Sequence, residues 1–170
     1  MTSKGGMTDA MSGRSAGRFF GIVALFAIAG PPIGGLVVSV FLSLLAATPQ
    51  LMVHDWVEAV TIFLTGTLFG TMFGLPIAYF SGVLPAAGVG LAVAIWDRRT
   101  GLISWRIAIA AAIVSWIFVA MGAGNLIESD EGTRTWHVAS LLAHLAAASF
   151  CWWMARTIFG RPMHANAVGT

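Results

Sequence analysis

The chain has 170 residues, of which 58% are apolar and only 9% are charged. Soluble domains carry roughly 25% charged residues, so this composition excludes an ordinary soluble domain, a disordered chain and a disulfide-stapled secreted module. It indicates an integral membrane protein. The nine basic residues form no basic face, and we therefore predict no nucleic-acid partner.

The first 18 residues are polar, and we expect them to form a flexible cytoplasmic N-terminus. The apolar run 19–47 is longer than the roughly 7–15 residues of a signal-peptide core, so it predicts a retained span. Cleavage after Ala46 or Ala47 is the alternative. Pro31 and Pro32 break this run, but each half is too short to cross roughly 30 Å of hydrocarbon. A kinked single span is therefore favoured over a hairpin.

The second apolar stretch, 57–96, would form a helix about twice the thickness of the membrane. Because prolines interrupt helices, Pro76 and Pro85 predict breaks. We expect a crossing over 57–80 and a broken continuation to residue 96. That continuation is re-entrant, interfacial or a fifth span.

Two further runs, 102–122 and 137–159, complete four predicted spans, followed by a cytoplasmic tail over 160–170. Basic residues favour cytoplasmic loops. With four spans, only Arg134 of the nine basic residues lies outside, whereas a fifth span would move most of them outward. The sequence therefore predicts an all-α four-span bundle in a bacterial inner membrane, with both termini cytoplasmic and the first two spans broken by proline and glycine.

Small residues recur every four positions in the second stretch. Such ladders let membrane helices approach closely. A step of four residues drifts by about 40° around a helix, so we expect at least two contacts, one within the chain and one with another protein or a second copy. The predicted helix-packing residues are Gly66, Gly70, Gly74, Ala78, Gly82, Ala86, Gly90 and Ala94.

His144 is the ionisable residue placed deepest in a predicted span, and His137 lies seven positions earlier. Buried ionisable groups in membranes suggest function, here a haem ligand, a metal ligand or a proton relay. The structural alternative is a neutral histidine bonded to another helix, for example at Thr61, Thr65 or Thr67. No second axial ligand is evident, so no cofactor is predicted, and metal binding is left open.

His54, Asp55 and Glu58 form a candidate cluster on the outer face. Imidazoles and carboxylates suit zinc, and the cluster could meet His137 and the acidic residues of 128–131. Alternatively, the carboxylates only place negative charge at a helix N-terminus.

No catalytic motif is present: the chain has no nucleophile elbow, P-loop, zinc-protease motif or Cys-x-x-Cys pair. We therefore expect no catalytic residues and a non-enzymatic accessory or scaffold subunit. Its small-residue ridges would pack in the lipid bilayer against a second copy or a larger membrane complex. The alternatives are a small transporter or pore using His144 and the outer cluster, and a haem-binding electron-transfer subunit.

Overall fold

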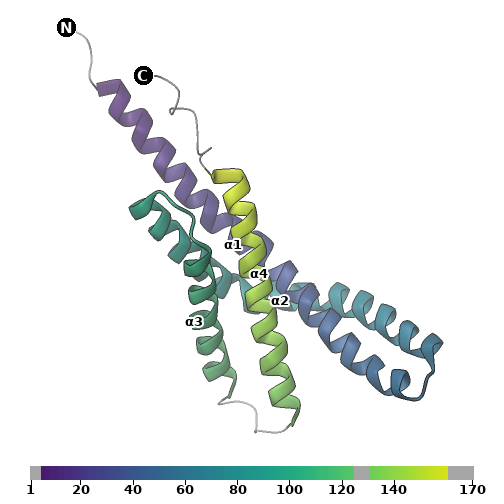
Figure 1. Ribbon diagram of the computed structural model, residues 1–170. Coiled ribbons are helices and arrows are strands. Elements are labelled where there is room, and N and C mark those ends of the chain that lie inside the picture. The colour runs from purple at the N-terminus through teal and green to yellow at the C-terminus, as the bar shows by residue number, and fades with distance from the viewer. Residues whose placement is uncertain (1–4, 125–130, 161–170) are drawn as a thin grey trace, which may run out of the picture.

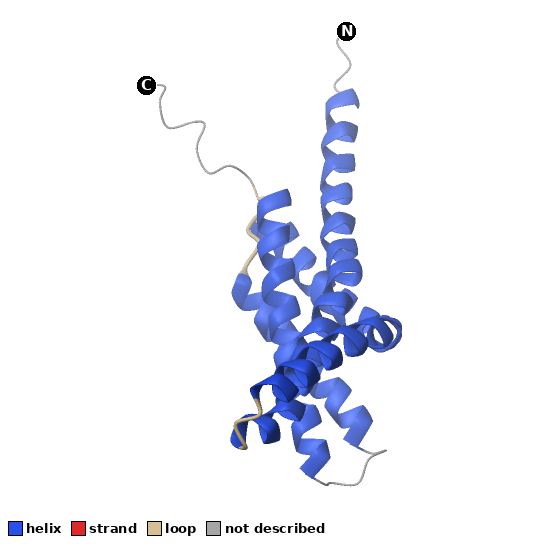
Figure 2. Ribbon diagram, turned by 90° about the vertical axis from the view of Figure 1, so that its right-hand side faces the viewer, coloured by secondary structure: helices blue, strands red, loops and turns tan. Residues whose placement is uncertain are grey.

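The computed structural model describes residues 5–124 and 131–160. In these residues the chain forms four helices, each long and apolar enough to cross a membrane. Short loops at 53–55 and 101–104 join the first three helices, and the described chain contains no strand (Figure 2). The predicted all-α four-span bundle is confirmed. The helices are α1 (Gly5–Met52), α2 (Trp56–Thr100), α3 (Trp105–Gly124) and α4 (Glu131–Phe159).

Each helix packs on its neighbours in chain order, and α4 packs back on α1. Figure 1 shows α1 and α2 as a long hairpin that crosses the α3–α4 pair. The turn of this hairpin lies away from α3 and α4. The start of α1 and the end of α4 lie at the same end of the molecule (Figure 1), as an even number of crossings requires.

The N-terminal segment differs from the expected flexible region. α1 begins at Gly5, so residues 5–18 belong to this helix. No proline separates them from the apolar run, and adding a residue to an existing helix is far easier than starting a new one. Apart from Gly160, the predicted tail lies outside the described residues.

The helices run through the four prolines that we expected to break them. A proline leaves the carbonyl four residues earlier without its usual donor. For Pro32 that carbonyl belongs to Ile28, and it accepts a hydrogen bond of 2.8 Å from the Tyr79 hydroxyl of α2. Neighbouring helices satisfy freed backbone groups in this way within membranes.

The predicted broken continuation over 81–96 is therefore part of one helix, α2. Figure 1 shows α2 changing direction along its length, so that its two halves follow the two halves of α1. Asp55 caps the start of α2 by accepting from the Glu58 amide at 3.1 Å, as N-cap residues do. Gly101 ends the helix at φ 71°, a left-handed conformation that suits glycine.

The small-residue ladder of α2 faces α1 along most of its length. A Cβ added at Gly66 would lie 2.7 Å from Ser43 Oγ, and one at Gly90 would lie 2.8 Å from Phe26 Cβ. Between these ends, a Cβ at Gly35 of α1 would lie 3.1 Å from Ala78 Cβ. Such spacings leave no room for larger side chains, so glycine permits the close approach of the two backbones.

Much of the ladder therefore faces one helix, α1, while α2 also packs on α3; the expected contact with another protein or a second copy stays a prediction. The other contacts run to α1 as well, from Gly70 to Ser39, from Gly82 to Pro31 and from Ala86 to Gly30. A partner helix can follow a drifting ladder when the two helices bend and wind around each other, and both helices contain prolines. The ladder is thus occupied by a contact within the chain.

A bidentate ion pair fastens the open end of the hairpin. Arg18 Nε and Nη2 each donate to Asp97 at 2.7 Å. The Asp97 side chain is only 7% exposed, so the carboxylate is stabilised by this pairing rather than by water. The pair fixes the start of the apolar part of α1 beside the end of α2.

The hydrophobic core lies near this end of the molecule, where all four helices contribute. Phe159 of α4 covers Gly21 of α1, with ring atoms where a Cβ would stand. The Trp152 indole of α4 donates to the Ile103 carbonyl at 3.1 Å, which ties the loop before α3 to α4. The core centres on Ile22, Phe26, Val93, Ala108, Ala112, Cys151 and Ala155.

Candidate functional site: an intramembrane cleft beside His144

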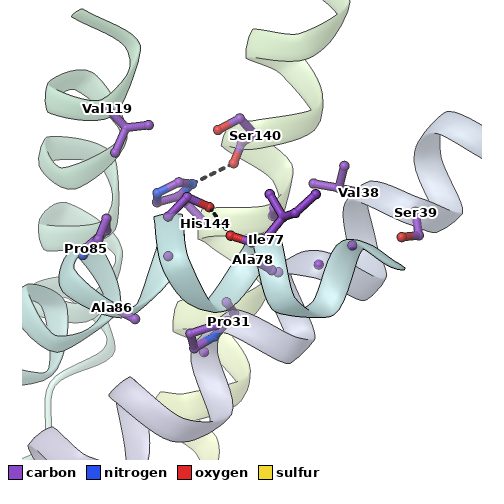
Figure 3. Close-up of a pocket in the computed structure, with 18 of the residues that line it drawn as sticks. Pro31, Val38, Ser39, Ile77, Ala78, Pro85, Ala86, Val119, Ser140 and His144 are labelled. Atoms are coloured by element: carbon purple, nitrogen blue, oxygen red, sulfur yellow. Dashed lines mark hydrogen bonds between the residues drawn. The ribbon is translucent and has the colours of Figure 1, made fainter. Parts of the chain in front are cut away.

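An apolar cleft lies between the α1–α2 hairpin and α4, and α3 contributes to one wall. Its volume is about 510 Å³. We call it the His144 cleft. Figure 3 shows residues of all four helices around it. Among the residues that define it are Pro31, Ser39, Ala78, Pro85, Val119 and His144.

The backbone of the hairpin explains why this space exists. Several wall residues are glycines and alanines, including Gly34, Gly74 and Ala147, so few side-chain atoms project from the walls. The hairpin also diverges from the first half of α4 as it extends toward its turn (Figure 1). Small side chains and diverging helices together leave a volume that no residue fills.

His144 supplies the principal polar group of the cleft. Its Nδ1 lies 2.8 Å from the Ser140 carbonyl oxygen, one turn earlier on α4. This hydrogen bond stays within α4. Among the described residues, the predicted hydrogen bond from His144 to another helix is therefore wrong. Figure 3 shows the imidazole extending from α4 toward α3, beside the contact with Ser140.

His137 does not share this cleft. Its ring packs edge-on against Trp116 of α3, with centroids 6.3 Å apart. The two histidines of the candidate polar site therefore have different neighbours. The described chain contains no group of three His, Cys, Asp or Glu side chains placed to hold a metal ion.

The outer cluster is placed at the turn of the hairpin. Asp55 acts as the N-cap of α2, and His54 adopts φ 63° in the turn before it. Figure 1 places this turn away from the beginning of α4, and His137 of α4 packs on Trp116 of α3 rather than joining the cluster. Glu128 and Asp130 lie outside the described residues, and so does the side chain of Glu131.

Sequence reasoning missed two features of the site. The first is the cleft, whose size depends on the distance between α4 and the hairpin. No pattern of residues in the sequence predicts that distance. The Arg18–Asp97 pair joins residues 79 positions apart, although a carboxylate beside two arginines at a span end gave a usable signal. Both features arise from contacts between distant segments.

A second apolar cleft of about 680 Å³ separates α2 from α3. It shares Pro85, Val89 and Val119 with the His144 cleft. Apart from Ser115, its lining residues are apolar or glycine, so it offers little to orient a ligand.

Comparison with protein-family models, curated proteins and solved structures finds no match to this chain.

Proposed function

We propose that this protein binds a small, mainly apolar molecule from the bilayer in the His144 cleft. The observation that supports the proposal is a volume of about 510 Å³ whose walls are mostly apolar and carry a few serine hydroxyls and one imidazole. Small-molecule sites typically enclose roughly 300–1,000 Å³ and combine apolar walls with a few polar groups. A transporter must bind its substrate before moving it across the membrane, so the same site could also serve a small transporter.

We place the bundle in a bacterial inner membrane with both termini cytoplasmic. Arg98 and Arg99 follow the Asp97 end of α2, and Arg156 lies near the Trp152 contact at the same end. Asp55 and Glu58 lie at the opposite end of α2. This asymmetry supports the orientation, because cytoplasmic loops are enriched in basic residues.

Photolabelling of the full chain in lipid nanodiscs tests the proposal. The probe is 4-methylbenzophenone, which is apolar and inserts into nearby C–H bonds under light. We expect saturable labelling that mass spectrometry maps to the cleft walls. Labelling that never saturates and spreads over the lipid-facing side chains would contradict the proposal.

A cleft-filling variant sharpens this experiment. Gly74 lines the cleft, and a Cβ there would stand in ordinary contact with Ser39 Oγ at 3.9 Å, so Gly74→Phe is designed to fill the cleft from this wall. We expect it to abolish the saturable labelling. Gly122→Phe is the matched control, because a Cβ there meets nothing within 4 Å and Gly122 does not line the cleft. Labelling that persists in Gly74→Phe would assign the probe to another place.

An accessory role is a second candidate, and the exposed aromatic pair of α2 favours it. Phe69 and Phe73 stack with ring planes 6° apart, and they are 52% and 64% exposed. Aromatic residues are enriched in protein interfaces, and this part of the hairpin lies away from α3 (Figure 1). The pair therefore offers a packing face for a membrane partner.

Affinity purification in a mild detergent, followed by mass spectrometry, tests the accessory role. A stoichiometric membrane partner that is lost in the double variant Phe69→Ala/Phe73→Ala would support it. A chain that purifies alone, with or without these substitutions, would argue against it.

A further inference from the structure

We infer that the molecule bound in the His144 cleft is a neutral alcohol or phenol whose hydroxyl donates a hydrogen bond to His144 Nε2. This inference rests on the proposed function and adds the chemical class of the ligand. The evidence for it is the hydrogen bond that the other ring nitrogen, Nδ1, makes with Ser140.

The contact with Ser140 fixes the tautomer of His144. A backbone carbonyl can only accept a hydrogen bond, so Nδ1 carries the proton in the 2.8 Å contact with the Ser140 oxygen. A charged imidazolium is costly inside a membrane, which favours the neutral ring. In a neutral imidazole with a protonated Nδ1, Nε2 holds a lone pair and acts as an acceptor.

Nε2 is left without a partner. Among the described residues, the Ser140 contact is the hydrogen bond of His144, and the imidazole forms part of the cleft wall. The hydroxyl of Ser81, also in the wall, donates to the Ile77 carbonyl of its own helix at 2.7 Å. Among the described residues Nε2 is thus an acceptor without a donor, and a ligand in the cleft can supply one.

The walls also select a neutral ligand. No Lys, Arg, Asp or Glu lines the described cleft, so a carboxylate, phosphate or ammonium group would be left without a counterion in a low-dielectric site. The ligand must therefore be uncharged and must donate a hydrogen bond, and a hydroxyl on a hydrocarbon body does both. It is uncharged, and its proton matches the lone pair of Nε2.

A pair of probes that differ only in the donor tests the inference. 4-(Hydroxymethyl)benzophenone carries a hydroxyl, and 4-methylbenzophenone has a similar shape without it. For the full chain in nanodiscs, we expect the hydroxyl probe to saturate at a concentration roughly fivefold to tenfold lower, as one hydrogen bond provides. Competition with unlabelled benzyl alcohol should be stronger than competition with toluene.

Variants of the two histidines locate the acceptor. His144→Phe should remove the preference for the hydroxyl probe and leave saturable labelling by the methyl probe. His137→Phe is the matched control, because it makes the same change one heptad away and outside the cleft. A preference that survives in His144→Phe, or that is lost in His137→Phe, would overturn the assignment.

The outcomes separate this inference from the proposed function. If both probes label the cleft saturably with equal affinity, the site stands and the hydroxyl class is wrong. If neither probe saturates, the proposed site itself is wrong.

A measurement on the unmodified sequence guards against a variant that fails to fold. With ¹⁵N-labelled histidine, a hydroxyl donor should shift the Nε2 resonance of one histidine, whereas the methyl probe should not. Identical spectra with both probes would overturn the inference.

Discussion

The α1–α2 hairpin and the α3–α4 pair are both antiparallel helix pairs, but they pack in different ways. In the hairpin, glycines set against Ser39, Ser43 and Phe26 bring the backbones together. In the α3–α4 pair, the rings of Trp116 and His137 stand between the helices, and α3 is the least buried of the four spans. Glycines therefore bring the backbones of the hairpin together, whereas α3 and α4 are joined by a ring contact at Trp116 and by small residues of the core.

The comparison shows how a small membrane protein can be firmly held and still retain an empty volume. Lipid provides no hydrophobic drive between helices, so close van der Waals contact must hold them together. The hairpin supplies that contact over much of its length. The His144 cleft lies between the hairpin and α4, and these helices diverge toward the turn of the hairpin (Figure 1).

The largest expected effect comes from enlarging the ladder where it packs against Phe26 and the α1 backbone. Gly90→Leu would place a Cβ 2.8 Å from Phe26 Cβ and 3.2 Å from the Val23 backbone. We expect a loss of about 3 kcal/mol in the free energy of unfolding, in line with overpacking of a core. Thermal unfolding in detergent measures it. Gly88→Leu is the control, because a Cβ at Gly88 meets nothing within 4 Å, and equal losses in both variants would contradict the close packing.

The ion pair at the open end of the hairpin should give the next largest effect. Asp97→Asn leaves the partly buried Arg18 guanidinium without its carboxylate, which should cost about 2–3 kcal/mol. Arg18→Gln combined with Asp97→Asn should recover part of this loss, since no unpaired charge remains. A double variant whose loss equals the sum of the single losses would show that the pair contributes no coupling energy.

The contact at the proline-containing segment of α1 should matter less. Tyr79→Phe removes the donor to the Ile28 carbonyl, and we expect a loss of about 1 kcal/mol. Thr61→Val is the control, because that hydroxyl bonds only the Val57 carbonyl of its own helix. Chemical denaturation of both variants compares them, and a larger loss in Thr61→Val would refute the role of Tyr79.

The smallest effect is expected in the α3–α4 pair. Trp116 Nε1 is buried and lacks a hydrogen-bond partner in the described chain, so Trp116→Phe removes an unsatisfied donor and should leave stability nearly unchanged. Trp152→Phe removes a bond to Ile103 and should cost about 1 kcal/mol. Thermal unfolding of the two variants tests this order, and a reversed order would show that Trp116 packing dominates.

Much of the architecture was predictable because the membrane restricts the choices. Four long apolar runs separated by polar segments are enough to predict four helices, since backbone groups in lipid must be satisfied within a helix. The prolines were harder to interpret. Pro32 was predicted to break α1, but the Tyr79 hydroxyl that satisfies Ile28 comes from a residue 51 positions away.

The site was less predictable. His144 was identified as a candidate because ionisable residues are rare within spans, but its partner was expected on another helix. The structure instead pairs it with Ser140 on its own helix. Periodicity shows that the two residues share a face, but it does not show which of several nearby acceptors is used.

The sequence by itself determined the membrane class, the number of helices and the glycine ladder, because these follow from composition and local spacing. Only the tertiary structure decided which helix occupies the ladder, that Arg18 meets Asp97, and that a volume of about 510 Å³ remains beside His144. The reason is physical. A contact between distant segments depends on the bends and crossing angles of whole helices, and small changes in those angles decide whether two faces touch or separate.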